Sequence, residues 1–271
     1  MSLPRISATV LTLDEERNIA RCLGSLTWAD EIVVVDAGST DRTVQIARQF
    51  TERIVHHPWP GFLAQRRFSF DLCREDWIMF LDADEWVPPE LGAEIRQAIC
   101  AGTGQSAFWI SRRNWFIDRW MDHVWAPDLL LRVFRKGAAS LEGNEPHIHV
   151  KLNPGFLAGT LSHQLLHQAY HSIADLCSKA GRYSDQFAES DATDSLYSPA
   201  KLVLSPLVSM LKLYIWKRGF LEGAHGLVVA WISAHYHFLK YAKKWEKLRR
   251  KGARAVRELP AVAEQKEGHG R

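Results

Sequence analysis

A short acidic segment, Asp82-Ala83-Asp84, directly follows the apolar run of residues 77–81. An apolar run of this length that ends in charged residues is typical of a buried strand. In an open α/β sheet the ligand crevice lies at the carboxyl ends of the strands, so both carboxylates would reach it. Carboxylate oxygens suit Mg²⁺ and Mn²⁺, which commonly also bind substrate phosphates. The alternative is a solvated turn with helix-capping acids, the commoner role of an isolated Asp-x-Asp.

A third aspartate, Asp36, follows a predicted strand at residues 31–35 with the apolar run Ile-Val-Val-Val, and it precedes the turn at 37–41. A carboxylate here could accept a hydrogen bond from a nucleobase or a ribose, and the small residues would let a ligand approach closely. The segment lacks the GxGxxG pattern, so a dinucleotide-binding fold is not indicated. Asp36 and the acidic pair end two strands of one predicted sheet, and we expect them to face a single nucleotide diphosphate.

A cationic side chain, Arg66, lies on the predicted helix between these strands. Its guanidinium is suited to bidentate contact with phosphate. The alternative interpretation places Arg66 on a solvated helix face.

The N-terminal part of the chain alternates strands and helices. Strands are predicted at residues 6–12, 31–35, 53–56 and 77–81. One helix is predicted after residue 14 and a second one from the turn at 37–41 to about residue 50, and two more are predicted at 62–73 and 88–100. This alternation predicts an α/β fold with a parallel, doubly wound sheet and a site at the carboxyl ends of its strands. Residues 107–151 are predicted to be rich in β-structure, with strands at 107–110 and 129–134 separated by an aromatic loop at 114–128.

The length of 271 residues allows a substantial core in one domain with an appendage. The four cysteines are widely spaced, without a Cys-x-x-Cys pair. This favours reduced thiols, buried as small apolar side chains, in a reducing cytosolic setting. We expect no secretory signal, because residues 1–5 lead directly into a strand.

Charge is distributed unevenly along the chain. Residues 1–200 contain 19 Lys or Arg and 26 Asp or Glu, whereas residues 201–254 contain 12 Lys or Arg and 2 Glu. The basic part holds two apolar helical segments, at 200–218 and 226–250, and Pro206 is expected to break or kink the first. Neither segment has 18 uninterrupted apolar residues, which disfavours a spanning helix. We favour helices lying in the interface of an anionic membrane, the alternative being a hairpin packed on protein.

Several segments in this order resemble the family 2 glycosyltransferases, which have the GT-A fold. They lie at residues 6–19, 28–43, 59–62 and 76–85, and they are most similar to the bacterial lipopolysaccharide-core glucosyltransferase branch. The resemblance is nearly continuous over residues 6–100 and patchier to about residue 250. It implies a metal-dependent inverting transfer of a sugar, with glucose expected, from a UDP-sugar to a lipid-linked glycan such as lipopolysaccharide core.

The resemblance also implies roles for single residues. The UDP part of the donor would be held by Thr12, Glu15, Asp36, Arg66 and Asp82. Asp84 would be the main ligand of Mg²⁺ or Mn²⁺, with Asp82 as a second ligand. The chain departs from the family pattern at Asp14, where the family commonly has asparagine before the glutamate.

Inverting transfer needs a base that deprotonates the acceptor hydroxyl. The family has an acidic residue followed by arginine before a strand, and Asp128 with Arg132 matches that pattern. Asp128 is therefore the expected base, its alternative being a turn carboxylate paired with Arg132. Glu85 and Asp122 are reserve candidates.

Histidines are concentrated at His147, His149, His163, His167 and His171. The last three are spaced by four residues, so a helix would place them on one face. A zinc site is disfavoured, because the His-Glu-x-x-His motif is absent and no cysteine joins them. The family has a His-Glu pair near this region, and one of these histidines is expected to contact diphosphate, metal or acceptor.

The expected organisation has four parts. These are a nucleotide-sugar half at residues 1–105, an acceptor half at 106–195, membrane-associating basic helices at 196–251 and a mobile tail at 252–271. We expect a cytoplasmic protein, peripheral or monotopic at the inner membrane face, with no nucleic-acid partner.

Two other functions stay open. A nucleotidyltransferase acting on a sugar phosphate would release pyrophosphate, but its glycine- and lysine-rich phosphate loop is missing. A non-enzymatic module could bind anionic surfaces through residues 201–254, which leaves the acidic strand ends unexplained.

Overall fold

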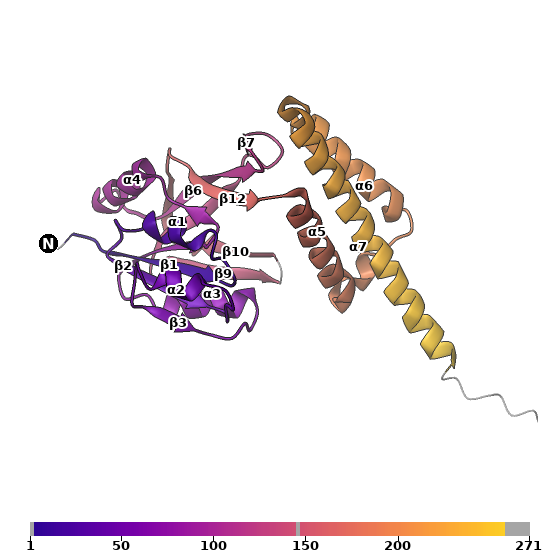
Figure 1. Ribbon diagram of the computed structural model, residues 1–271, viewed down its shortest axis with the longest axis horizontal. Coiled ribbons are helices and arrows are strands. Elements are labelled where there is room, and N and C mark those ends of the chain that lie inside the picture. Colours follow the sequence, from indigo (N-terminus) through magenta and orange to yellow (C-terminus); the bar gives the residue numbers. More distant parts are fainter. Residues whose placement is uncertain (1–2, 145–146, 258–271) are drawn as a thin grey trace, which may run out of the picture. The chain divides into compact units, whose positions relative to one another are not determined.

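The structure is a computed structural model, shown in Figure 1, that describes residues 3–144 and 147–257. The chain divides into two compact units, residues 1–171 and 172–271. Among the described residues, all strands belong to the first unit, and the second unit is helical.

A mixed sheet forms the centre of the first unit. Its strands within the described residues are β1 (Ile6–Thr12), β2 (Glu31–Asp36), β3 (Ile54–His56), β4 (Trp77–Asp82), β5 (Glu85–Trp86), β6 (Gln105–Phe116), β7 (Arg119–Met121), β8 (Leu129–Arg135), β11 (Leu157–Thr160) and β12 (Leu165–Tyr170). Their order in space is β3-β2-β1-β4-β8-β6-β12-β5, and both β7 and β11 pair with β6. Strands β9 (Ala139–Asn144) and β10 (His147–Leu152) form a separate hairpin.

The predicted α/β architecture with a mostly parallel sheet is confirmed. Strands β3, β2, β1 and β4 are mutually parallel, and β6 pairs in parallel with β11 and β12. Strand β8 is antiparallel to both β4 and β6 and joins the two parallel parts.

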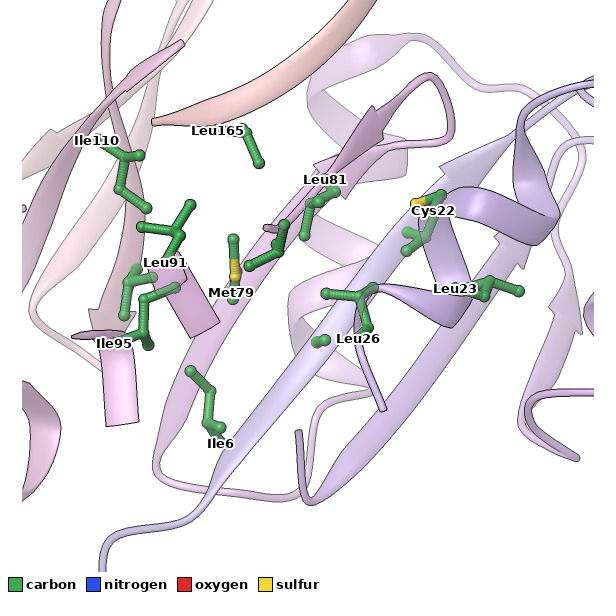
Figure 2. Packing of buried hydrophobic residues seen from close by; sticks show 14 of the residues in the cluster. Ile6, Cys22, Leu23, Leu26, Met79, Leu81, Leu91, Ile95, Ile110 and Leu165 are labelled. Atoms are coloured by element: carbon green, nitrogen blue, oxygen red, sulfur yellow. The ribbon is translucent and has the colours of Figure 1, made fainter. Parts of the chain in front are cut away.

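Helices cover both faces of this sheet. They are α1 (Ile19–Gly24), α2 (Thr43–Ala47), α3 (Phe62–Asp71) and α4 (Pro89–Cys100). Alternation along β4 decides which core each side chain enters: Met79 packs with α1 and α4, whereas Phe80 packs with Phe70 of α3. Figure 2 shows the larger core, where Met79 lies with Leu23 of α1 and Leu91 of α4. Helix α4 confirms its predicted range to within one residue, and α3 begins as predicted but ends at Asp71, two residues early. Helix α1 begins only at Ile19, and α2 ends at Ala47.

The predicted aromatic loop is partly wrong. Strand β6 continues to Phe116 and turns into β7, so the loop contains a hairpin. Trp115 and Trp120 lie opposite each other across this hairpin, with ring centroids 5.0 Å apart. Aromatic cross-strand pairs of this kind stabilise antiparallel strands, which is why the chain pairs here.

The cysteines are all free thiols, as expected, but their burial is uneven. Cys22 and Cys73 are buried, whereas Cys100 and Cys177 are exposed. The expectation that all four cysteines are buried is therefore correct for Cys22 and Cys73 and wrong for Cys100 and Cys177.

The second unit contains three α-helices and three shorter helical segments within the described residues. They are α5 (Ile173–Glu189), η1 (Asp191–Leu196), α6 (Lys201–Leu211), η2 (Lys212–Trp216), η3 (Gly219–Glu222) and α7 (Gly223–Arg257). Both α5 and α6 pack along α7, as Figure 1 shows. The predicted tail begins inside α7, and residues 258–271 lie outside the described part.

Pro206 does not break the first apolar segment. Helix α6 runs through it from Lys201 to Leu211, although proline removes one backbone hydrogen bond. Packing along α7 compensates, because tertiary contacts supply most of the stability of a helix in a protein. None of the helices in the described ranges is both long and apolar enough to span a bilayer.

Candidate active site

The register of three strands brings two of the predicted carboxylates together. Thr12, the last residue of β1, pairs with Asp36 of β2, and Leu11 pairs with Asp82 of β4. Parallel strands end at one edge of a sheet, so Asp36 and Asp82 lie at the same edge with Thr12 on the strand between them. The expectation that they share an edge is confirmed.

Asp36 is held rigidly by the turn that follows it. Its buried carboxylate accepts hydrogen bonds from the backbone N–H groups of Gly38 at 3.0 Å and Ser39 at 3.1 Å, and from the Ser39 hydroxyl. Gly38 has φ +112°, a conformation that favours glycine. The turn therefore orients the carboxylate at the strand end.

The loop after β1 is tied to the loop after β2. Asp14 accepts a hydrogen bond from the backbone N–H of Thr40 at 2.7 Å, and the backbone N–H of Glu15 donates to the Thr43 hydroxyl at 2.7 Å. Burial raises the pKa of Glu15; a hydrogen bond from Asn18 opposes this rise, and the charge of Asp84 adds to it. Asp14 thus joins two loops, and Glu15 lies within the field of the acidic segment.

Asp82 accepts hydrogen bonds from two arginines. Its Oδ1 accepts from Arg66, and its Oδ2 accepts from Nη2 of Arg132 at 3.4 Å. Both guanidinium groups also lie over the ring of Phe80, 4.8 and 4.6 Å from its centroid. Burial acts to raise the pKa of Asp82, but Arg66 and Arg132 outweigh it and hold the pKa far below its ordinary value. Asp82 is therefore ionised and positions two cations at the strand end.

Glu85 is completely buried and bridges two arginines. Its Oε1 accepts from Arg112 at 2.7 Å and from Arg132 at 2.6 Å, while Oε2 accepts from the backbone N–H of Asp82 at 3.0 Å. A carboxylate enclosed in this way has no access to a substrate proton. Glu85 is thus unsuited to the reserve role of base, and its role is structural.

Asp128 is bound by Arg112, not by Arg132. Its Oδ2 accepts from Nε of Arg112 at 2.8 Å, and its carbonyl oxygen accepts from the backbone N–H of Arg112 at 2.8 Å. The alternative pairing with Arg132 is wrong, because Arg132 binds Glu85 and Asp82 instead. Arg112 thereby links Asp128 to the buried network.

Asp122, the other reserve candidate, lies just after the β6–β7 hairpin. Arg113 donates two hydrogen bonds to it, at 2.7 and 2.9 Å, and holds the pKa of Asp122 below its ordinary value. A carboxylate with a lowered pKa is a weaker base, so Asp122 is less suited to this role.

Asp84 contacts a histidine from a distant part of the chain. Its Oδ2 lies 3.2 Å from Nε2 of His167, whose Nδ1 lies 2.6 Å from Oδ1 of Asn114. The other carboxylate oxygen, Oδ1, is buried and has no hydrogen-bond partner among the residues described. The hydroxyl oxygen of Thr12 is a second buried atom of this kind.

The predicted helical stacking of three histidines is wrong. His167 lies on strand β12, His163 precedes that strand and His171 follows it. The segment pairs with β6 on one side and β5 on the other, and this pairing aligns His167 with both Asn114 and Glu85. His149 lies exposed on β10, and the side chain of His147 is outside the described residues.

A divalent cation fits the donor set around Asp84. A buried acceptor oxygen without a donor is costly, and a cation would satisfy Oδ1. No cluster of three His, Cys, Asp or Glu side chains suited to a metal occurs in the described ranges, so phosphate and water oxygens would complete the shell, as is usual for Mg²⁺. Asp82 suits the metal less well, since both of its oxygens accept from arginines.

Two residues of this network had no role in the sequence analysis, Arg112 and Asn114. The available signal was their position in the strand: β6 carries both between the buried Ile110 and Phe116. A charge in the middle of a buried strand requires a partner, and Glu85 and Asp128 are those partners.

Replacement of Glu85 by glutamine is expected to destabilise the fold. Arg112 and Arg132 would lose the negative charge that compensates them, and removing one member of a buried pair costs about 3–5 kcal/mol. The free energy of unfolding, measured with urea, is expected to fall by about that amount.

The exposed Glu142, paired with Lys151, is the matched control for this substitution. Its replacement by glutamine is expected to cost less than about 1 kcal/mol. Equal losses for the two variants would contradict the structural role of Glu85.

Comparison with known proteins identifies the family of this chain. Residues 7–159 match the family model for glycosyl transferase family 2. An uncharacterized glycosyltransferase of Rickettsia felis is 32% identical over 259 residues, 91% of each chain. The lipopolysaccharide core biosynthesis glycosyltransferase LpsC of Rhizobium meliloti is 28% identical, covering 88% of this chain and 94% of that one. Among solved structures, glucosyl-3-phosphoglycerate synthase of Mycobacterium tuberculosis with Mg²⁺ and UDP is 25% identical, with a TM-score of 0.35 over 41% of this chain and 43% of that one. The chain belongs to glycosyl transferase family 2, and its mixed α/β sheet with C-terminal helices is that of a GT-A glycosyltransferase.

Proposed function

We propose that this enzyme transfers glucose from UDP-glucose to a lipid-linked glycan such as lipopolysaccharide core, with inversion at the sugar and with a divalent cation. The observation that carries the proposal is the shared strand edge, where Asp36 and Asp82 flank Thr12 and the neighbouring Asp84 retains an unpartnered oxygen. The acceptor class is supported by the similarity to LpsC. The reaction would take place at the cytoplasmic face of the membrane.

The donor would occupy the edge of the sheet. Asp36 would accept a hydrogen bond from the uracil or the ribose, since its turn holds the carboxylate at the end of β2. Thr12, at the end of β1, and Glu15, in the loop after it, would line the same place. Arg66, already oriented by Asp82, would present its remaining donors to the diphosphate.

Asp84 would hold Mg²⁺ or Mn²⁺ through Oδ1, and His167 would keep the carboxylate in place from the other side. When bound, the cation offsets the negative charge that develops on the departing diphosphate. Asp82 would contribute mainly by fixing Arg66 and Arg132.

Asp128 would act as the base. As the acceptor hydroxyl oxygen forms its bond to the anomeric carbon, the bond from that carbon to the diphosphate oxygen breaks, and the hydroxyl proton passes to Asp128. Arg112 orients Asp128 through Oδ2 and through its backbone carbonyl. Because UDP leaves from the opposite face of the sugar, the anomeric configuration inverts.

A thermal-shift series with nucleotide sugars tests the donor. UDP-glucose with Mn²⁺ at about 100 times its dissociation constant should add about 2.7 kcal/mol of stability, and the melting temperature should rise by about 5 °C or more. GDP-, ADP- and CMP-sugars serve as controls.

Product analysis separates the proposed reaction from its alternative. A glycosyltransferase releases UDP, whereas a nucleotidyltransferase acting on a sugar phosphate releases pyrophosphate. Pyrophosphate release, or a melting temperature unchanged by every UDP-sugar, would contradict the proposal.

A further inference from the structure

Helix α6 and the following segment η2 expose an apolar face. We define this face by Val203, Leu204, Leu207, Val208, Leu211 and Ile215, each exposed by more than half. Their spacing places them along one side of the helix. Trp216, at the end of η2, is 88% exposed. An exposed apolar surface of this extent is typical of an interaction site.

On the opposite side of α6 two serines face another helix. The Ser205 hydroxyl lies 2.9 Å from Nδ1 of His237, and the buried Ser209 hydroxyl lies 3.1 Å from that of Ser233, both on α7. A surface helix of a water-soluble protein has the reverse polarity, with its apolar stripe toward the core. Small hydroxyl residues between helices, with apolar side chains outward, are typical of helices surrounded by lipid.

Four of the five lysines of α7 pair with acids within the second unit. Lys243 pairs with Asp185 at 2.6 Å, Lys247 pairs with Asp191 at 2.9 Å, and the completely buried Lys244 pairs with Asp194. Asp185 of α5 and Asp191 and Asp194 of η1 therefore neutralise part of the positive charge of residues 201–254. These lysines do not form the free basic surface expected for an anionic membrane or a nucleic acid.

We propose that the apolar face binds a lipid bilayer by inserting among the acyl chains near the headgroups, with hydrocarbon contact supplying the affinity. Together, α6 and η2 span 16 residues, or about 24 Å, less than the roughly 30 Å of a hydrocarbon core. The segment therefore lies in the interface instead of crossing it. The surface would bind lipid whatever sugar the enzyme transfers.

The charges beside the apolar face favour lipid over a second copy of the chain. Lys212 and Arg218 are exposed, and Glu222, the only acidic residue between 201 and 239, is buried. Cations next to an exposed tryptophan match the phosphates of lipid headgroups. Two copies meeting through this face would bring these cations together, which is unfavourable.

Vesicle flotation of the full chain tests this inference. The protein is expected to float with pure phosphatidylcholine vesicles in 0.1 M NaCl and equally in 1 M NaCl, because hydrocarbon insertion is not screened by salt. Adding anionic phosphatidylglycerol is expected to increase binding only slightly. Binding that requires the anionic lipid and disappears in 1 M NaCl would overturn the inference.

Substitutions identify the inserting surface. The triple variant Leu207→Ser, Leu211→Ser and Ile215→Ser is expected to lower partitioning about 100-fold, and Trp216→Ser alone about 10-fold, by losing buried apolar area. The matched control replaces Leu3, Phe156 and Leu157, also exposed, by serine and is expected to float like the original chain. Equal flotation of the triple variant and the control would overturn the inference.

Two further measurements distinguish lipid binding from a folding defect and from dimer formation. The thermal shift with UDP-glucose should be the same in the triple variant, which shows that donor binding and folding are intact. If the original chain fails to float and sediments as a dimer that the triple variant dissociates, the apolar face is an interface between copies and the inference is overturned.

Discussion

Replacement of Asp84 by asparagine is expected to abolish Mn²⁺-dependent sugar transfer, with a loss in kcat of about 10³-fold. The amide removes the negative charge from the unpartnered oxygen that would hold the cation, while its size preserves the contact with His167. Losing stabilisation of a developing charge in an active site commonly costs about 10²–10³-fold, and losing the cation adds to this. Turnover of UDP-glucose and calorimetric binding of UDP with and without Mn²⁺ provide the two measurements.

The matched control is Asp122→Asn, the same chemical change near the β6–β7 hairpin. This variant is expected to keep both its activity and its Mn²⁺-dependent binding of UDP. Should Asp84→Asn still bind UDP more tightly with Mn²⁺ than without it, the metal would have another ligand.

Replacement of Asp128 by asparagine is expected to remove transfer but spare the donor. The amide oxygen can still accept the hydrogen bond from Arg112, so the local structure should persist. It cannot take a proton, and the loss of general-base catalysis is expected to lower kcat by about 10²–10⁴-fold. Steady-state kinetics and the UDP-glucose thermal shift together separate catalysis from binding.

The two aspartate variants should differ in their pattern of loss. Asp84→Asn should impair donor binding and turnover together, whereas Asp128→Asn should change kcat alone. Full transfer by the Asp128 variant would mean that another group accepts the proton.

The sequence was sufficient to predict the strand edge because the signals there are local. An apolar run that ends in a carboxylate identifies both β2 and β4, and alternation with helices implies that the strands are parallel. Parallel pairing then brings Asp36 and Asp82 to one edge without further information. The same reasoning could not show which oxygens of Asp82 and Asp84 were already engaged.

The arginine network could not be predicted, because its partners come from distant segments. Arg112 meets Glu85 across 27 positions, and Arg132 meets the same carboxylate across 47. The spacing of four between His163, His167 and His171 suits a helix equally well, and only pairing with β6 makes this segment a strand. Such pairing depends on the whole sheet rather than on neighbouring residues.

The charge of the C-terminal region illustrates a similar limit. A count of lysines along the chain cannot reveal that α5 and η1 supply acids to α7. The orientation of α6 was likewise ambiguous, because Ser205 and Ser209 form a polar stripe in a helical projection, and such a stripe suggests a solvent-facing side. The fold turns that stripe toward α7 instead.

Strand β1 fixes where Asp36 and Asp82 lie relative to each other, because Thr12 pairs with Asp36 and the preceding residue, Leu11, pairs with Asp82. Inserting or deleting one amino acid in β1 would turn its side chains to the opposite face of the sheet, and it would shift the register with both β2 and β4. The turn at Gly102 and Gly104, where nothing lies within 4 Å of an added Cβ, imposes no such constraint. Natural relatives and engineered libraries should therefore vary in length at that turn and keep β1 at seven residues.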